Sequence, residues 1–247
     1  MTADTPFLSV IIPSYNEQAR IGDTLTAVLA YLQTRETPYE IIVVDDGSRD
    51  KTSSVVESKI QGLESARLIA YQPNRGKGYA VRQGMLASRG EVVVFTDADL
   101  STPVTEIDVA VQHLHSGFDI VIGSRALAES KISRYQPPYR RVGSRVFNLL
   151  RDAIVGVDIS RFKDTQCGFK AFRGTVGRTL FGLARVDGFM FDVETLYVAI
   201  KLGYRIDEMP VHWTDMPGSK LRLFRDTVRM FRDLAAIRFA HRNLVRG

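Results

Sequence analysis

The feature that most limits how this chain can fold is the regular alternation of short apolar runs with amphipathic stretches over residues 1–100. Short apolar runs bounded by turn residues predict strands, and apolar residues that recur every three or four positions predict helices. We predict strands at 7–12, 40–44, 67–71 and 91–96, and helices at 21–32, 51–62 and 78–87. Strands that alternate with helices are joined by right-handed crossovers and form a parallel sheet. The expected fold is therefore α/β and Rossmann-like, with a mainly parallel sheet flanked by helices.

The remainder of the chain is less regular. We predict a strand at 120–123, a connection rich in Pro and Arg at 130–141, and helices at 142–155, 191–202 and 224–242. The sequence contains no long Gly, Ser or Pro linker and no internal repeat, so a single domain is the simplest organisation. We place this domain at 1–220 and assign 221–247 to a basic amphipathic C-terminal helix.

Three polar clusters directly follow predicted strands. They are Pro-Ser-Tyr-Asn-Glu at 13–17, Asp-Asp-Gly-Ser at 45–48 and Asp-Ala-Asp-Leu-Ser at 97–101. In open α/β sheets, ligands bind outside the carboxyl ends of the strands. We therefore expect the three clusters to share one edge of the sheet and to form the functional site.

Asp97 and Asp99 place two carboxylates close together, and a divalent cation would relieve their repulsion. Mg²⁺ is commonly held by one or two carboxylates together with phosphate oxygens of a substrate. A D-x-D pattern also occurs in ordinary solvated turns. Its position after an apolar strand, on the same edge as two other polar clusters, favours a site for Mg²⁺ or Mn²⁺.

Two other polar segments each allow two interpretations. Asp45 and Asp46 either cap the following helix, whose N-terminus favours negative charge, or accept hydrogen bonds from a ribose or a base. Residues 74–78, Asn-Arg-Gly-Lys-Gly, combine two glycines with two cations at the start of a helix. They form either an ordinary turn or a place for a phosphate group.

Charge is unevenly distributed along the chain. The sequence has 33 basic and 28 acidic side chains, net +5, but residues 1–100 are net −3 and the remainder is net +8. Segments 131–151 and 220–247 are each net +6. In the second segment one helical face carries Arg222, Arg225, Arg229 and Arg232, and another carries Phe224, Val228, Phe231 and Ala235. Such a helix either lies on an anionic membrane surface or packs on the protein with its arginines in water.

The basic composition also raises the possibility of a nucleic-acid-binding protein. The sequence has no helix-turn-helix, zinc-ligand spacing or aromatic and basic RNA motif, so we expect no nucleic-acid partner. The longest uncharged stretch, 5–16, is too short to cross a bilayer, and the N-terminal residues do not resemble a secretory signal. The single cysteine, Cys167, is expected to be a small buried residue. These features favour a cytoplasmic location.

Taken together, the motifs resemble those of glycosyltransferase family 2, whose members are inverting enzymes with the GT-A fold. The matches are P-x-Y-N-E at 13–17, V-D-D-G-S at 44–48, N-x-G-x-G at 74–78 and D-x-D at 97–99. The resemblance implies a metal on the diphosphate of a sugar nucleotide, held by Asp97 and Asp99, with Ser101 at the position of a third contact. The residues it implies for binding the sugar nucleotide itself are Pro13, Tyr15, Glu17, Val44, Asp46, Lys77, Asp97, Ala98 and Lys220.

Further strings narrow the resemblance to the branch that transfers sugars to polyprenyl phosphates. They are G-S-R at 123–125, D-T-Q-C-G-F-K at 164–170, F-D-V-E at 191–194, and Trp213 followed by G-S-K at 218–220. These strings look most like those of the dolichyl-phosphate beta-glucosyltransferases, which use UDP-glucose. The related mannosyltransferases use GDP-mannose and usually have Gln at the position of Ser101. The resemblance implies a nucleotide-sugar half at about 1–125 and an acceptor half at about 126–220.

A phosphate acceptor determines the chemistry that we expect. Its oxygen is negative near neutral pH and can attack the anomeric carbon without a protein base, so catalysis depends on placement and on control of charge. Arginines offer paired donors to phosphate oxygens. The candidates for holding the acceptor phosphate are Arg125, Arg140, Arg141 and Ser144.

The predicted catalytic residues are Asp99, Arg125 and Asp192. Asp192 or Glu194 would act as a general base if the acceptor were a sugar hydroxyl, whereas Asp192 could also simply cap a helix. The expected activity is metal-dependent transfer of glucose from UDP-glucose to a polyprenyl phosphate, by an enzyme peripherally associated with the cytoplasmic face of a membrane. The alternatives are transfer of mannose from GDP-mannose and transfer of a sugar to a non-lipid acceptor.

Overall fold

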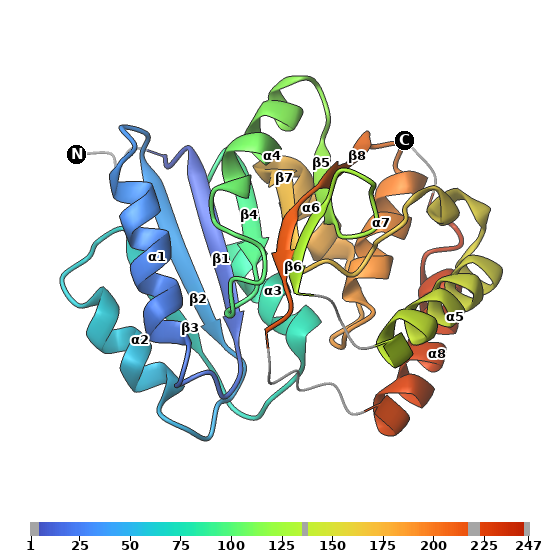
Figure 1. Cartoon of the computed structure of the whole chain (residues 1–247), viewed down its shortest axis with the longest axis horizontal. Coiled ribbons are helices and arrows are strands. Elements are labelled where there is room, and N and C mark those ends of the chain that lie inside the picture. Colours follow the sequence, from blue (N-terminus) through green and yellow to red (C-terminus); the bar gives the residue numbers. More distant parts are fainter. Residues whose placement is uncertain (1–4, 135–137, 217–222, 245–247) are drawn as a thin grey trace.

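A computed structural model describes residues 5–134, 138–216 and 223–244 of the chain. In this part of the chain, seven strands form one sheet in the order β3-β2-β1-β4-β7-β5-β8 (Figure 1). The strands are β1 (Leu8–Ser14), β2 (Tyr39–Asp45), β3 (Ala66–Ala70), β4 (Val92–Thr96), β5 (Ile120–Ser124), β7 (Phe169–Arg173) and β8 (Ile206–Pro210). Paired strands are parallel except that β7 is antiparallel to both β4 and β5. The predicted α/β fold with a mainly parallel sheet is confirmed.

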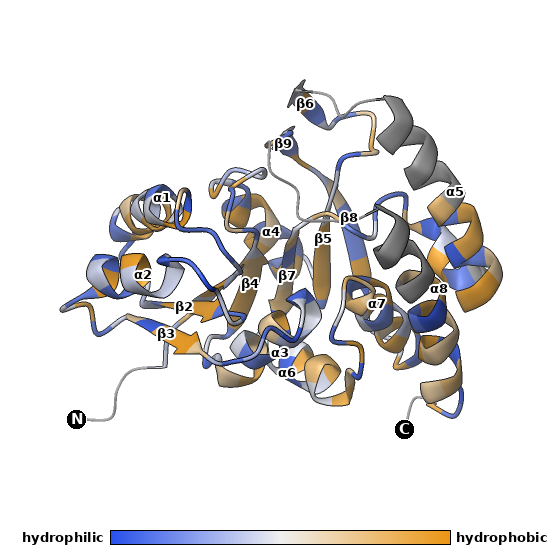
Figure 2. Cartoon of the chain, turned by 90° about the horizontal axis from the view of Figure 1, so that it is seen from below, coloured by the Kyte–Doolittle hydropathy of each residue, from blue (hydrophilic) through white to orange (hydrophobic). Residues whose placement is uncertain are grey.

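The sheet is covered by apolar layers on both faces, because successive side chains of a strand point in opposite directions. In β1, Val10 and Ile12 belong to one buried cluster and Ile11 belongs to the other. The first cluster includes residues of α1 (Ile21–Gln33), α2 (Thr52–Ile60) and α4 (Glu106–His115). The second includes residues of α3 (Lys77–Ala87), α6 (Gly174–Leu183) and α7 (Phe191–Lys201). Figure 2 shows the two sets of helices on opposite sides of the sheet.

Every element predicted within residues 1–100 is present, with small shifts of its ends. In the remainder of the chain, several elements were not predicted: α4, α6, β7, β8 and a small sheet of β6 (Lys131–Arg134) and β9 (His212–Thr214). Strands β7 and β8 read Phe-Lys-Ala-Phe-Arg and Ile-Asp-Glu-Met-Pro. Charged residues interrupt the apolar runs in these strands, and this interruption removed the signal by which the other strands were found.

Helices α5 (Pro138–Val155) and α8 (Leu223–Ala240) pack against each other beside α7 (Figure 1). Helix α8 is buried along Leu234 and Ile237, and His241 continues the buried stripe just beyond its end. Phe231 and Ala235, which belong to the predicted apolar face, are only half-buried. The buried stripe of α8 therefore does not include Phe231 and Ala235; the side chains of Phe224 and Val228 lie outside the described part of the chain, and the role of this apolar face stays a prediction. No helix in the described ranges is both long and apolar enough to span a membrane.

Candidate active site

The three polar clusters lie at the carboxyl ends of neighbouring strands, as predicted. Strands β1 and β2 run in register, so that Pro13 lies beside Val44 and Ser14 beside Asp45, and β4 pairs with the other side of β1. The backbone N–H of Asn16 donates to Ser48 Oγ at 2.8 Å, and the N–H of Arg49 donates to Asn16 Oδ1 at 2.8 Å. These reciprocal hydrogen bonds hold the first two clusters together and keep Asn16 at a φ of 52°.

Asp45 and Asp46 have different structural roles. Asp45 Oδ1 accepts a hydrogen bond from the backbone N–H of Ser48 at 2.9 Å, and its other oxygen accepts one from Ser53 in the first turn of α2. Asp46 accepts three hydrogen bonds from the loop before α3: Asn74 Nδ2 at 2.7 Å, Arg75 N at 2.7 Å and Gly76 N at 2.8 Å. Burial raises the pKa of Asp46, although the backbone donors oppose this shift. Asp45 thus stabilises the start of a helix, and Asp46 fixes loop 74–76.

Two glycines allow these loops to approach each other. Gly47 has a φ of +72°, and a Cβ there would lie 2.6 Å from the backbone nitrogen of Asn74. Gly76 has a φ of +118°, and a Cβ there would lie 2.4 Å from the carbonyl oxygen of Asp187. Any other residue at either position would combine an unfavourable backbone conformation with a clash.

The predicted metal-binding carboxylates lie directly after β4. Asp97 Oδ1 forms an ion pair with Lys77 Nζ at 2.6 Å, so the third polar cluster is joined to the N-terminus of α3. Asp99 Oδ1 accepts hydrogen bonds from the backbone N–H and the hydroxyl of Ser101, at 2.9 and 2.8 Å. Ser101 therefore orients the Asp99 carboxylate directly, and its predicted contact with a metal stays a prediction.

Gly168 fits tightly against Asp97. The backbone N–H of Asp97 donates to the carbonyl oxygen of Gly168 at 3.1 Å, and a Cβ on Gly168 would lie only 2.0 Å from Asp97 Oδ2. Burial opposes ionisation of Lys77, but the nearby carboxylates, with Asp97 contributing most and then Asp192, raise its pKa overall. Asp97 thus already attracts one cation, the Lys77 ammonium group.

The chemistry of this donor set suits a hard divalent cation. Among the described residues, no group of three or more His, Cys, Asp and Glu side chains comes together to hold a metal. Two carboxylates at one loop can hold Mg²⁺ or Mn²⁺ when a substrate phosphate supplies further oxygen ligands. Asp97 and Asp99 fit that arrangement.

Asp192 lies at the start of α7 and points toward a buried lysine. Its Oδ1 lies 2.6 Å from Lys170 Nζ, which also donates to the carbonyl oxygen of Cys167 at 2.8 Å. Burial raises the pKa of Asp192, whereas Lys170 and Lys77 oppose this shift. The helix-cap alternative for Asp192 is wrong, because Met190 occupies the N-cap position and Asp192 forms its ion pair with Lys170 of β7.

Cys167 is fully buried, as expected, and burial raises its pKa to about 11.

Arg125 extends from the end of β5 and is held by Asp164. Its Nε and Nη2 atoms donate to the two carboxylate oxygens of Asp164 at 2.6 and 2.8 Å, and its guanidinium lies 5.4 Å from the centre of the Trp213 ring. Burial opposes ionisation of Asp164, but Arg125 lowers its pKa overall. This bidentate pair fixes the orientation of the guanidinium group.

The remaining predicted site residues are described in part. Ala98 accepts a hydrogen bond from Thr24 Oγ1 through its carbonyl oxygen at 2.6 Å, and Glu17 forms an ion pair with Arg20 at 2.6 Å. Tyr15 is half-buried in the first polar cluster. Lys220 and the side chains of Arg140, Arg141 and Ser144 lie outside the described part of the chain, and their roles stay predictions.

Asp164 and Lys170 belong to the D-T-Q-C-G-F-K motif at 164–170, but their own roles were not predicted. Their partners, Arg125 and Asp192, are 39 and 22 residues away, and no local spacing relates them.

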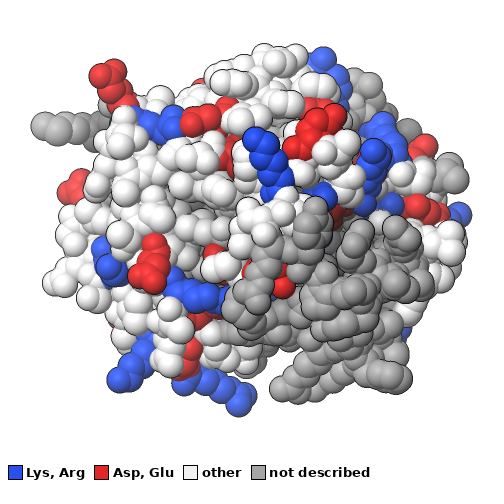
Figure 3. All heavy atoms as spheres, in the orientation of Figure 1, with Lys and Arg blue, Asp and Glu red and all other residues white. Residues whose placement is uncertain are grey.

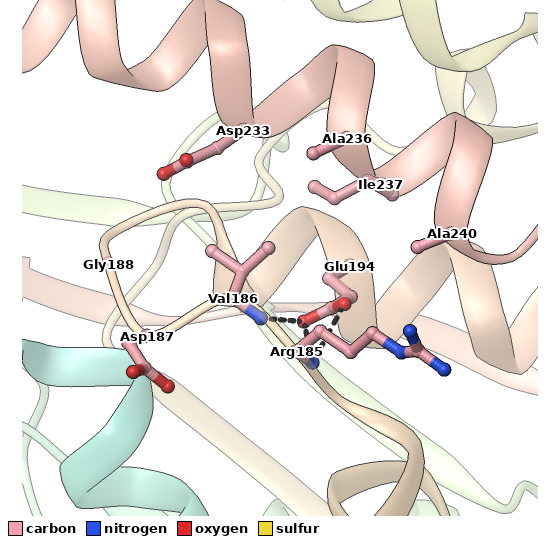
Figure 4. Close-up of a pocket in the computed structure, with 9 residues that line it drawn as sticks. All are labelled: Arg185, Val186, Asp187, Gly188, Glu194, Asp233, Ala236, Ile237 and Ala240. Atoms are coloured by element: carbon pink, nitrogen blue, oxygen red, sulfur yellow. Dashed lines mark hydrogen bonds between the residues drawn. The ribbon is translucent and has the colours of Figure 1, made fainter.

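The fully buried Glu194 accepts hydrogen bonds from the backbone of Arg185 and Val186 and from His241 Nε2, so its contacts are separate from those of Asp192. A pocket of about 310 Å³ lies beside Glu194, between loop 185–188 and α8 (Figure 4).

Comparison with known proteins places the chain in a family. The model of the family described as "Glycosyl transferase family 2" matches residues 9–173. The dolichyl-phosphate beta-glucosyltransferase of Drosophila melanogaster is 41% identical over 243 residues, which cover 93% of this chain and 74% of that protein. The human enzyme of the same name is 36% identical over 250 residues, covering 96% of this chain and 76% of that protein.

A solved structure supports the fold. Glucosyl-3-phosphoglycerate synthase from Mycobacterium tuberculosis, in complex with Mn²⁺, UDP and glucosyl-3-phosphoglycerate, has a TM-score of 0.68. The match covers 94% of this chain and 78% of that one, at 21% identity. The fold is thus of the GT-A type, and this chain belongs to glycosyltransferase family 2.

Proposed function

We propose that the chain transfers glucose from UDP-glucose to a dolichyl-type polyprenyl phosphate, with inversion at the anomeric carbon and with the help of a divalent metal. The observation that carries the proposal is similarity to dolichyl-phosphate beta-glucosyltransferases over nearly the whole chain, 93% and 96% for the two relatives described. The similarity therefore includes the second half, where the acceptor is expected to bind. UDP and Mn²⁺ in the related fold support the choice of donor and metal.

The strand-end carboxylates and cations are suited to a sugar nucleotide. Asp97 and Asp99 would hold Mg²⁺ or Mn²⁺, which when bound would neutralise charge on the diphosphate. Lys77 pairs with Asp97 and supplies a further positive charge. The nucleoside is assigned to the loops after β1 and β2, with Pro13, Tyr15, Glu17, Val44 and Asp46 as its predicted contacts.

The acceptor phosphate is assigned to the arginines of the second half. The guanidinium of Arg125 is fixed by Asp164 and has further N–H groups to donate to a phosphate oxygen. Arg140, Arg141 and Ser144 are the other proposed contacts, and Lys220 is proposed to act on the leaving diphosphate. An acceptor that is already negative needs no proton removed, so the chemistry rests on placement and electrostatics.

The ion pair of Asp192 with Lys170 supports a role for Asp192 in controlling charge. A buried carboxylate beside the metal site would repel the acceptor phosphate if its charge were not balanced, and Lys170 provides that balance. A general-base role for Asp192 would belong to the alternative with a sugar hydroxyl as acceptor.

We place the enzyme on the cytoplasmic face of a membrane, bound peripherally to an anionic surface. The proposal rests on the two net +6 segments, 131–151 and 220–247, and on large exposed apolar side chains of α5 and α8, where Leu149 is 71% and Phe239 is 69% exposed. On the face shown in Figure 3, the described basic and acidic side chains are interspersed. Sedimentation with anionic liposomes at low salt, reversed by added salt, would support this placement, whereas equal binding to neutral liposomes would contradict it.

The activity is tested by incubating the protein and Mg²⁺ with polyprenyl phosphate and either labelled UDP-glucose or labelled GDP-mannose, followed by organic extraction. The proposal predicts lipid-soluble label from UDP-glucose. Label from GDP-mannose alone would favour the mannosyltransferase alternative. Label that enters only a water-soluble product would favour a non-lipid acceptor.

A further inference from the structure

We infer that Glu194 and His241 are positioning residues for the donor site, because together they fasten the end of α8 to the loop that supports the N-terminus of α3. This inference rests on the proposed function, since it takes loop 74–78 to be part of the donor site. It adds a role for two buried residues that the proposed chemistry does not use. Glu194 lies in α7, His241 directly follows α8, and the loop they join lies between α6 and α7.

The first step is the set of contacts around Glu194, which is fully buried. Its carboxylate accepts hydrogen bonds from the backbone N–H groups of Arg185 and Val186, at 3.0 and 2.8 Å. His241 Nε2 donates to Glu194 Oε1 at 2.7 Å and is itself only 3% exposed as a residue. One carboxylate thus joins loop 185–188 to the residue that follows α8. Removing one partner of such a buried carboxylate is strongly destabilising, because the charge is then left uncompensated.

The second step is the contact between loop 185–188 and α3. The backbone N–H of Tyr79 donates to the carbonyl oxygen of Asp187 at 3.1 Å, and Arg82 Nη2 lies 2.6 Å from Asp187 Oδ1. A Cβ on Gly76 or Gly78 would lie 2.4 or 2.6 Å from a carbonyl oxygen of this loop. The loop and the first turn of α3 are therefore in close contact, and displacement of one must disturb the other.

The third step leads from α3 to the strand ends. Residues immediately before α3 donate to Asp46, and Lys77 in its first turn forms the ion pair with Asp97. A continuous series of direct contacts thus runs from His241 through Glu194 and Asp187 to the predicted donor site.

A pocket lies beside Glu194, between loop 185–188 and α8. Figure 4 shows open space between Val186 of the loop and the α8 side chains of Ala236, Ile237 and Ala240. Val186 also packs against the buried cluster that includes Leu234 and Ile237 of α8. The hydrogen bonds described between the loop and the end of α8 run through Glu194, so loss of the His241 contact should loosen the loop and, through it, loop 74–78.

The test compares the full-length protein with His241→Leu, which removes the donor to Glu194, and with His241→Gln, which restores an N–H donor. His113→Leu is the matched control, because His113 also pairs with a carboxylate, Asp207, but lies in α4 on the other side of the sheet. Hydrogen exchange is measured without ligand, and the affinity for UDP and for GDP is measured by calorimetry with Mg²⁺.

We expect His241→Leu to speed exchange at 185–188 and at 74–79 and to weaken binding of the nucleotide by about fivefold or more. We expect His241→Gln and His113→Leu to stay near the wild type at 74–79. Faster exchange in α8 alone, with unchanged exchange at 74–79, would overturn the inference. Unchanged nucleotide affinity in a loosened His241→Leu protein would overturn it as well.

A second variant keeps the inference testable if His241→Leu does not fold. Asp187→Asn weakens the loop's ion pairs with Arg82 and Arg75 and leaves the contact of Glu194 with His241 in place, so exchange should rise at 74–79 while α8 stays protected. Unchanged exchange at 74–79 in this variant would break the proposed series of contacts. Because exchange is measured without nucleotide, a wild type that binds neither UDP nor GDP would contradict the proposed function and leave this structural test intact.

Discussion

The two halves of the candidate site are built in different ways. In the first half, polar loops follow neighbouring parallel strands, and they are joined by short hydrogen bonds between backbone and side chains, such as those of Asn16 with residues 48 and 49. In the second half, ion pairs join residues from separate elements: Arg125 with Asp164, which is partly buried, and Lys170 with Asp192, which is buried. The first half therefore presents a preformed backbone surface, whereas the second half fixes the direction of individual charges. The halves meet where Asp97 contacts both Lys77 and Gly168.

The largest expected effect is on catalysis, from Asp99→Ala in the first half. The proposed metal would lose a ligand where charge develops on the leaving diphosphate, so transfer should fall by at least about a hundredfold, in the range seen for lost electrostatic stabilisation. Initial rates of label transfer measure this loss. The unfolding temperature should stay close to that of the wild type, since Asp99 is only partly buried and lies in the loop after β4 rather than in the core. Normal turnover with divalent metal present would remove Asp99 from the metal site.

The second expected effect is on stability, from Lys170→Met in the second half. This change leaves Asp192 buried without its 2.6 Å partner, and loss of one partner of a buried pair costs about 3–5 kcal/mol. Unfolding in urea measures the free energy. The matched surface change is Arg35→Met, which breaks a partly exposed pair with Asp108 and should cost at most about 1 kcal/mol. Equal costs for the two changes would show that the buried pair has no special structural role.

The third expected effect is at the junction of the halves, from Gly168→Ala. A Cβ there would lie 2.0 Å from Asp97 Oδ2 and would force the carboxylate to move. Displacement of a group at the reacting centre by about 1 Å reduces rates by about a hundredfold. Gly182→Ala is the control, because nothing lies within 4 Å of the Cβ it would add. If both variants transferred sugar at the wild-type rate, the tight contact at Asp97 would be unimportant for activity.

The smallest expected effect is a difference in pH dependence between one carboxyl group of each half. Arg125 lowers the pKa of Asp164 in the folded protein, despite the opposing effect of burial, so Asp164 contributes stability above its unfolded pKa of about 4 and loses that contribution as the pH falls through its folded pKa. Burial raises the pKa of Asp46, so its contribution has the opposite sign and decreases as the pH rises through the folded pKa.

Unfolding free energies of Asp164→Asn and Asp46→Asn across the acid range should therefore differ from the wild type in opposite directions. As the pH is lowered, the unfolding free energy should decrease less in Asp164→Asn than in the wild type. It should decrease more in Asp46→Asn than in the wild type. If the unfolding free energies of the two variants changed with pH in the same way, the opposite pKa shifts of Asp164 and Asp46 would be contradicted.

The same contrast explains what could be predicted from the sequence. The first half of the site could be predicted from local pattern. Apolar runs indicated the strands, and residues 13–17, 45–48 and 97–101 were expected at one edge because ligands bind at the carboxyl ends of strands in open α/β sheets. The pairings of the second half depend on tertiary structure. Arg125 with Asp164 and Glu194 with His241 join residues 39 and 47 positions apart, and no periodicity connects them. Strand β7 was missed because the same Lys170 that balances Asp192 interrupts its apolar run.

The face on which α8 packs could not be read from amphipathicity alone. Its sequence offers two overlapping apolar stripes, and the contacts made by Leu234, Ile237 and His241 decide between them. A buried histidine looks polar in a sequence pattern, although its contact with Glu194 makes it part of the packed face. Polar residues with a buried partner are thus the main source of error in this half of the chain.

We propose that the first half of the site binds UDP-glucose together with a divalent metal and that the second half presents a lipid phosphate to it. The most direct test is the phase and the anomeric configuration of the product formed from labelled UDP-glucose, polyprenyl phosphate and Mg²⁺. We expect a lipid-soluble, β-linked glucosyl phosphate whose formation stops when the metal is chelated. A product with retained α-configuration, or lipid glucosylation that is insensitive to chelation, would contradict it.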